Sequence, residues 1–162
     1  MKKIKILIVA AGMALCVALT GCGGEEGGGG SDGISIDGGA IAQRLVEEVA
    51  FEDQLTQVDE ETALALYGLS SDQVASAFVY VGTGATAEEV AVIEGTNESG
   101  VEAIKKQVDE RLAGQMEDYG DYKPAEVPKL EDPLLETRGN FVILCVSGDN
   151  GTAEAIVEEM AK

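Results

Sequence analysis

The side chains of this 162-residue chain that could act on a substrate are almost all carboxylates. Thirty Asp and Glu stand against 11 Lys and Arg, and there is no histidine. The chain therefore lacks Ser-His-Asp and Cys-His nucleophilic systems and histidine ligands for zinc. Paired carboxylates can hydrolyse glycosidic bonds, but with no tryptophan and 4% aromatic residues little can stack on a sugar ring. We expect no enzyme, catalytic residue, cofactor or metal site, and a histidine-free carboxylate hydrolase is a disfavoured alternative.

Cys22 is the residue whose surroundings point most directly to a covalent reaction. It ends the sequence Leu-Thr-Gly-Cys, which follows three lysines near the start of the chain and the uncharged run 6–19. A basic start, an apolar run and small residues before a cut are typical of a secretory signal. Because this run is shorter than the about 20 residues that cross a bilayer, a transmembrane anchor is disfavoured.

The sequence at 19–22 resembles the bacterial lipobox, in which the cysteine sulfur receives a diacylglycerol group and the chain is cut before that cysteine. The resemblance implies cleavage between Gly21 and Cys22 and lipidation of Cys22. The alternative is an ordinary secretory signal that ends near a cysteine. Since two acyl chains hold a protein stably on a bilayer, we expect a protein attached through Cys22 to the extracytoplasmic face of the cell membrane.

Such processing fixes the charge and the cysteines of the remaining chain. It leaves 8 basic groups against 30 acidic ones, a formal charge of −22. Phosphate backbones and anionic headgroups repel such a chain, so we expect no nucleic-acid partner and membrane contact only through the lipid. Cys145 would be the one cysteine of the exported domain, which leaves no internal disulfide. Inside the apolar run "FVILCV" we expect its thiol to be buried and unreactive.

Three regions follow along the chain. Residues 1–21 are the predicted signal peptide, 22–39 the lipidated cysteine with a Gly-rich tether, and 40–162 a single α+β domain. The tether "GGEEGGGGSDGISIDGG" has no periodicity and little to bury. Asp32 and Asp37 lie within it without the further oxygen ligands of a calcium loop.

Periodicity and turn residues predict the elements of the first half of the domain. Residues 41–50 form an amphipathic helix, and a second helix has Asp59 as N-cap and Gly68 beyond its last turn. Strands at 74–81 and 89–94 flank the Gly-Thr-Gly-Ala turn and make a hairpin. Because Thr86 and Glu89 also fit a helix capping box, helix for 86–94 stays open as an alternative.

The longest predicted helix follows, with Ser99 as N-cap and Glu102 completing a capping box. It carries the basic cluster of the domain, Lys105, Lys106 and Arg111. This cluster is either a contact surface for an acidic partner or a solvated helix face, and pairing with Glu102, Asp109 and Glu110 favours the second interpretation.

The second half of the domain repeats the order strand, strand, helix. All three prolines lie in 122–133, which we expect to be an extended surface connection. Strands at 134–137 and 141–147 precede a helix that starts near Gly151. The order α-α-ββα-ββα predicts an α+β fold with a four-stranded antiparallel sheet of two hairpins, and with helices covering one face. The order of the strands does not follow from these patterns.

Three blocks of the chain resemble those of a bacterial family that carries a domain of unknown function: "FEDQLTQVDEETALALYGL", "VYVGTGATAEEVAVIEG" and "KPAEVPKLEDPLLETRGNFVILCVS". Its members are mostly Gram-positive lipoproteins with a signal, a short tether and one such domain. The resemblance covers about residues 41–162 and implies an anchored extracytoplasmic domain without a stated activity. Within the blocks we interpret five residues as core, cap or turn rather than ligands: Phe51, Asp53, Tyr67, Gly84 and Glu89.

The favoured function is therefore a non-catalytic lipoprotein of the cell envelope that binds an envelope protein or another envelope component. The alternative from a different class is an accessory lipoprotein of a transporter that binds a small ligand or a cation. The acidic charge favours cationic or basic partners over anionic ones, but it does not choose between these two functions.

Overall fold

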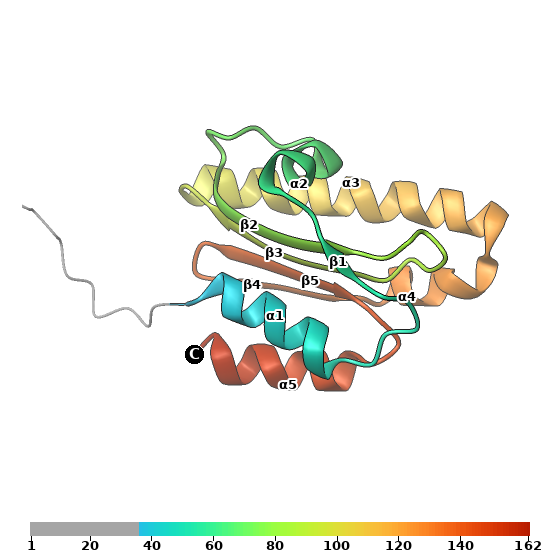
Figure 1. Ribbon diagram of the computed structural model, residues 1–162. Coiled ribbons are helices and arrows are strands. Elements are labelled where there is room, and N and C mark those ends of the chain that lie inside the picture. Colours follow the sequence, from blue (N-terminus) through green and yellow to red (C-terminus); the bar gives the residue numbers. More distant parts are fainter. Residues whose placement is uncertain (1–35) are drawn as a thin grey trace, which may run out of the picture. The chain divides into compact units, whose positions relative to one another are not determined.

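The computed structural model describes residues 36–162 (Figure 1). The predicted signal peptide, its cleavage between Gly21 and Cys22, the lipidation of Cys22 and most of the tether lie outside the described residues. Within 36–162, no helix combines the length and the apolar character that a membrane span requires. In chain order the elements are α1 Gly38–Glu48, β1 Thr56–Gln57, α2 Glu60–Tyr67, β2 Val74–Val81, β3 Glu89–Gly95, α3 Glu98–Tyr122, a 3₁₀ helix η1 Pro124–Glu126, α4 Val127–Glu131, β4 Leu134–Arg138, β5 Phe141–Val146 and α5 Asn150–Met160.

The strands form one antiparallel sheet in the order β1-β2-β3-β5-β4. Both predicted hairpins, β2–β3 and β4–β5, are present, and β3 pairs with β5 to join them. The α+β class and the antiparallel sheet are thus confirmed. The predicted count of four strands is wrong, because the short strand β1 extends the edge beside β2.

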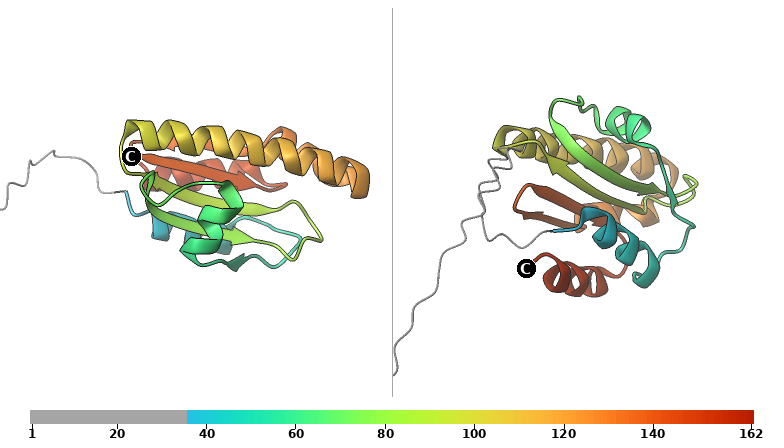
Figure 2. Two further views of the ribbon diagram at one scale, coloured as in Figure 1. Left: turned by 90° about the horizontal axis from the view of Figure 1, so that it is seen from above. Right: turned by 60° about the vertical axis from the view of Figure 1, so that its left-hand side comes forward.

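Helices cover both faces of the sheet, so the prediction of one covered face is wrong (Figures 1 and 2). Helices α2 and α3 pack on one face and α1 and α5 on the other. The cause lies in the central strands, which are apolar on both faces. In β5, Val142 and Leu144 belong to the core under α3, whereas Ile143 and Cys145 belong to the core under α1 and α5. Every residue of β5 is buried, as the unbroken apolar run predicted.

Several helix ends differ from the prediction because other side chains cap them. Helix α1 begins at Gly38, since the Asp37 carboxylate accepts a hydrogen bond from the Ala40 N–H at 3.0 Å. Helix α3 begins after Asn97, whose side chain accepts from the N–H of Gly100 at 3.1 Å, so the predicted N-cap at Ser99 is wrong. The predicted caps of α2, with Asp59 first and Gly68 last in the left-handed conformation, are confirmed.

The proline-rich segment 122–133 is helical in large part, which corrects the expectation of an extended connection. Pro124 opens η1 and Pro128 lies in the first turn of α4. A first-turn residue needs no N–H donor within its helix, so proline is tolerated there. The segment therefore folds back from the end of α3 (Figure 1). It brings the side chains of Lys123 and Glu126 into contact with the turn between β2 and β3.

Candidate functional site

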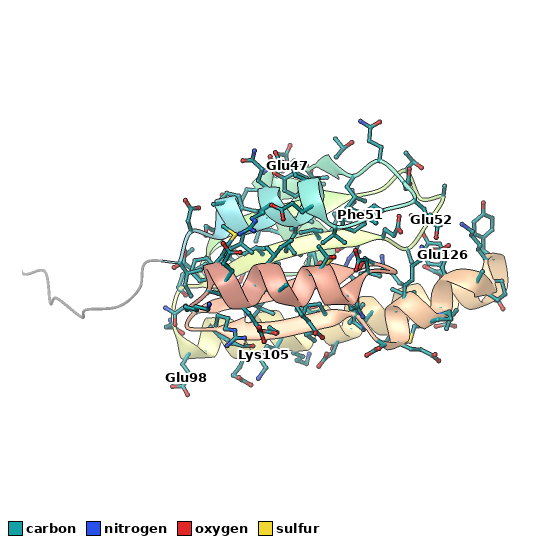
Figure 3. The ribbon with its side chains drawn as sticks, turned by 90° about the horizontal axis from the view of Figure 1, so that it is seen from below. Glu47, Phe51, Glu52, Glu98, Lys105 and Glu126 are labelled. Atoms are coloured by element: carbon teal, nitrogen blue, oxygen red, sulfur yellow. The ribbon has the colours of Figure 1, made fainter. Side chains whose placement is uncertain are left out.

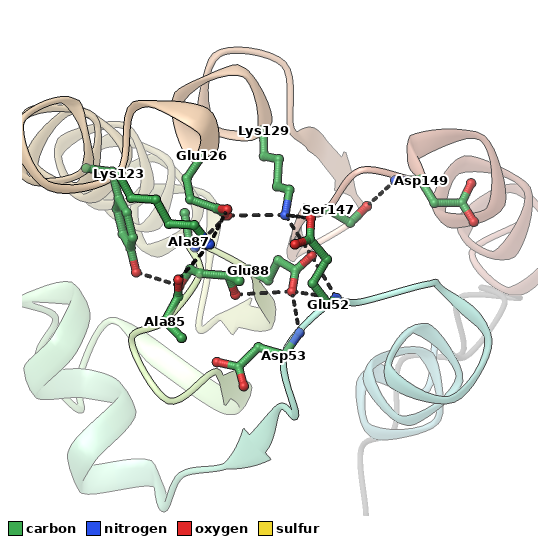
Figure 4. Close-up of polar contacts among 12 residues, drawn as sticks. Glu52, Asp53, Ala85, Ala87, Glu88, Lys123, Glu126, Lys129, Ser147 and Asp149 are labelled. Atoms are coloured by element: carbon green, nitrogen blue, oxygen red, sulfur yellow. Dashed lines mark hydrogen bonds and ion pairs between the residues drawn. The ribbon is translucent and has the colours of Figure 1, made fainter.

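Three segments that are far apart in the sequence meet at one end of the sheet: 51–54 after α1, 82–88 between β2 and β3, and 123–129 after α3 (Figure 4). The register places this end where Val81 pairs with Glu89 and Glu89 with Val146. Residues 86–88 precede strand β3, so the alternative of a helix over 86–94 is wrong. The Thr86 hydroxyl donates to Glu88 at 3.1 Å instead of capping a helix.

Glu88 is the centre of this arrangement, with its side chain 1% exposed. Its carboxylate accepts hydrogen bonds from the backbone N–H groups of Glu52 at 2.9 and 3.1 Å and of Asp53 at 2.9 Å. Burial by itself would raise the pKa of the Glu88 carboxyl, but these N–H groups and the ammonium of Lys129 hold that pKa below its usual value. Glu88 is thus an ionised clamp that joins the segment after α1 to the turn before β3.

Lys129 of α4 supplies the positive charge of the cluster. Its side chain is 12% exposed, and its Nζ lies 2.8 Å from Glu52, 3.0 Å from Glu88 and 3.2 Å from Glu126. Burial would lower the pKa of the ammonium, but hydrogen bonds to the three carboxylates outweigh it and raise the pKa above its ordinary value. The three N–H donors of a lysine match three acceptors, so the second clamp joins α4 to both other segments.

Glu126 completes the contact between 123–129 and the turn. Its Oε2 accepts from the Ala87 N–H at 3.1 Å, and its Oε1 lies 2.9 Å from Lys123 Nζ. Lys123 also donates to the carbonyl oxygen of Ala85 at 3.0 Å. Burial opposes ionisation of Glu126, yet Lys123 and the Ala87 N–H keep the pKa of its carboxyl below the usual value. The turn is therefore held on two sides by charged groups.

Asp53 holds the outer part of the same turn. Its Oδ2 accepts from both the N–H and the hydroxyl of Thr83 at 2.7 Å, and its Oδ1 accepts from the Gln54 N–H at 2.8 Å. The hydrogen bonds from Thr83 lower the pKa of the Asp53 carboxyl. Gly84, with a positive φ of 90°, closes the turn as expected of its position. These contacts fit the expectation of a structural role, as core, cap or turn, for Asp53.

A hollow of about 340 Å³ opens beside Asp53, on the side of the sheet that α1 covers. Figure 3 shows Phe51 and Glu52 at the same end of the domain as Glu126, with Glu98 at the opposite end. The wall of the hollow combines apolar side chains with one carboxylate and one carboxamide; its residues are Val46, Val49, Phe51, Asp53, Gln54 and Leu55.

A second buried ion pair lies under α3. The Arg111 guanidinium contacts the Glu89 carboxylate at 2.5 to 3.1 Å, and the Tyr67 hydroxyl donates to the same carboxylate. Arg111 therefore belongs to the core rather than to a solvated face, which corrects that part of the prediction. Lys105 and Lys106 do pair with exposed Glu102 and Glu110, both at 2.9 Å. Tyr67 faces inward as expected, and Glu89 has a structural role in this ion pair; neither residue lines the hollow.

Cys145 takes no part in either cluster. It is free and fully buried, and burial raises the pKa of its thiol to about 12. This agrees with the expectation of an unreactive thiol. Among residues 36–162, no group of three or more Cys, Asp or Glu is arranged to hold a metal ion.

Sequence reasoning missed the residues that organise the site. Glu88, Glu126 and Lys129 were not singled out, because each bonds to residues about 35 to 41 positions away. One local signal was present, since Glu126 and Lys129 stand three residues apart, the spacing of paired charges on one helix face. Because we expect an extended chain over 122–133 from the sequence, that spacing does not by itself predict a pair on one helix face.

The fold and these contacts define a small α+β domain whose candidate site is built by three segments, of which 123–129 is largely helical. The chain belongs to the family DUF4358, a domain of unknown function, whose model matches residues 47–147. All three site segments lie inside the matched range. No curated protein and no solved structure matches the chain.

Proposed function

We propose that this protein is a non-catalytic binding module of the bacterial cell envelope, anchored through a lipid on Cys22 and exposed on the extracytoplasmic side. The carrying observation is the hollow beside Asp53, bordered by loops that the Glu88–Lys129–Glu126 cluster fixes in place. Burying charges is expensive unless they are paired and hydrogen-bonded. A preformed concave surface with few polar groups is the usual form of a ligand site.

The position of the hollow supports presentation away from the membrane. Helix α1 starts beside Phe141. The approach is so close that a Cβ added to Gly38 would lie 2.7 Å from Cε1 of Phe141. Phe141 pairs with Glu94, whereas Glu89 pairs with Val146 at the other end of β3. The five residue steps from Glu89 to Glu94 place these ends about 17 Å apart at about 3.4 Å per residue. The domain thus begins at one end of the sheet and forms its candidate site at the other (Figure 3).

The anchor itself rests on the sequence around Cys22, and fractionation of cells tests it. The parent should sediment with membranes and leave them in detergent, whereas Cys22→Ser should be released from the membrane fraction. Cys16→Ser is the matched control and should remain attached, because that residue lies within the predicted signal. Sedimentation of Cys22→Ser with the membranes, as the parent does, would contradict the anchor.

Protease added to intact cells tests the side of the membrane. An extracytoplasmic domain should be digested at concentrations that leave a cytoplasmic marker intact. Assays of the purified protein on envelope glycans test the non-catalytic part of the proposal. Turnover that disappears on substitution of a Glu or Asp would contradict it.

A further inference from the structure

We propose that the hollow beside Asp53 binds a small organic cation, an ammonium group joined to a compact apolar body. This inference rests on the proposed binding function and names the class of its ligand. It follows from the shape and walls of the hollow and from the charges at the end of the domain where the hollow lies.

The walls offer apolar side chains to the body of a ligand beside their polar atoms. Val46 and Val49 come from the last turns of α1, and Phe51 and Leu55 come from the segment that follows. Phe51 and Leu55 pack only partly against the core under α1, so each keeps surface to offer a ligand. A volume of about 340 Å³ lies near the lower end of the range of about 300–1,000 Å³ for small-molecule sites. Phe51 also brings an aromatic ring to the wall, and the faces of aromatic rings attract cations.

The polar part of the wall suits a cation. Asp53 brings a carboxylate into the lining, and its Oδ1 accepts one hydrogen bond, from Gln54. A carboxylate oxygen has room for about two, so Oδ1 keeps the capacity to accept another from a ligand ammonium.

The surrounding charges favour the same sign of ligand. The three segments bring four carboxylates together with the two ammonium groups of Lys123 and Lys129, and both of these already contact carboxylates. Two negative charges remain uncompensated, and the Glu52 side chain is 66% exposed beside Asp53. A cationic ligand meets an attractive field here, and an anionic ligand of the same shape meets a repulsive one.

Calorimetric titration of the mature chain carrying Cys22→Ser tests the inference with three probes that share one apolar body: n-hexylammonium, n-hexanol and hexanoate. We expect hexylammonium to bind about fivefold or more tightly than hexanol, and hexanoate to bind most weakly. Asp53→Asn should abolish the preference for hexylammonium. Asp109→Asn removes the same charge from an exposed position on α3 and should leave the preference unchanged.

Gln54 provides variants that do not disturb the turn, because its exposed side chain lines the hollow. Gln54→Glu should strengthen hexylammonium binding and Gln54→Lys should weaken it, with unchanged melting temperatures. Equal affinities for hexylammonium and hexanol, no heat with any probe, or binding of calcium ions in their place would overturn the inference. If Cys22→Ser still releases the protein from membranes in that case, the ligand class alone is wrong and the anchor stands.

Discussion

At the scale of single residues, two adjacent glutamates perform separate tasks. Glu88 accepts hydrogen bonds from the segment after α1 and pairs with Lys129, whereas Glu89 pairs with Arg111 under α3. Successive residues entering a strand point to opposite faces, so the pair "EE" sends one carboxylate to the candidate site and the other into the core. The site is thereby coupled to the start of the central strand β3.

Removing the cation of the site cluster should destabilise the domain strongly. Lys129→Met leaves the buried carboxylate of Glu88 without its ammonium partner and removes one of the two from Glu126, which keeps Lys123. We expect the free energy of unfolding to fall by about 2–4 kcal/mol, somewhat below the loss for fully buried pairs because the Glu52 side of the cluster is exposed. Urea unfolding measures this.

The matched control for that substitution is Lys106→Met. Lys106 pairs with Glu110 on the exposed face of α3, where its side chain is 69% exposed. Exposed pairs contribute about 0–1 kcal/mol, so the midpoint in urea should hardly move. Similar losses in both variants would mean that the Lys129 cluster contributes no more than a surface pair.

What the sequence predicts at this scale is local. The N-cap Asp59, the left-handed Gly68 and the buried Cys145 follow from neighbouring residues, and all three are confirmed. The partners of Glu88 and of Arg111 come from other elements, and a single sequence does not specify which distant charges meet. Arg111, which the local pattern assigned to a solvated helix face, is therefore largely buried against Glu89.

At the scale of elements, periodicity predicted both hairpins, the long helix and the last helix. Strand β1 was missed because two residues carry no pattern, and it exists through its pairing with Tyr80 and Val81. Helix α4 was not predicted, because we took its proline as a residue that ends helices, although proline is tolerated in a first turn. The second covered face was missed although the uniformly apolar β5 indicated it. The candidate hollow depends on two of these three features. Helix α1, on the second covered face, forms one wall, and Lys129 of α4 holds the neighbouring segments in place.

Two glycines of α3 should respond in opposite ways to alanine. A Cβ at Gly100 would lie 2.4 Å from the Gln73 carbonyl oxygen, whereas one at Gly114 would meet no atom within 4 Å. We expect Gly100→Ala to lose about 1–3 kcal/mol of stability because the helix start must move away. Gly114→Ala should gain about 0.5–1 kcal/mol from reduced freedom of the unfolded chain.

Thermal and urea unfolding of the two variants measure these changes. Both substitutions lie in one helix and add the same methyl group. The difference between their changes in unfolding free energy therefore measures the effect of the close approach between Gly100 and Gln73. Equal effects of the same sign would show that the helix start is not held against Gln73.

At the scale of the whole molecule, acid should weaken the joint between the loops. The pKa values of the Glu88 and Glu126 carboxyls lie below their ordinary values in the folded protein. Their contribution to stability is therefore complete above the ordinary pKa of about 4.3 and is lost as the pH falls through the lower folded values. Comparing the unfolding free energies of the parent and of Glu88→Gln at each pH isolates the contribution of Glu88, because the other titrating groups are the same in both proteins.

The difference in unfolding free energy between these two proteins should stay constant from about pH 7 to 5 and shrink below about pH 4.3. Urea unfolding at a series of pH values measures it. A difference that grows on acidification would mean that Glu88 is protonated in the folded protein and that the cluster is not ionic.

The opposite placement of chain start and hollow makes a prediction for the anchored protein. Ala85 lies in the turn at the site end and Asn140 in the turn between β4 and β5, and both are exposed. On intact cells, a bulky polyethylene-glycol maleimide should label Ala85→Cys at nearly the rate seen with the lipid-free chain. Asn140→Cys should be slowed by anchoring, because its end of the sheet is where the domain begins, and buried Cys145 should not react. Equal slowing at both positions, measured by gel shift, would contradict presentation of the hollow away from the membrane.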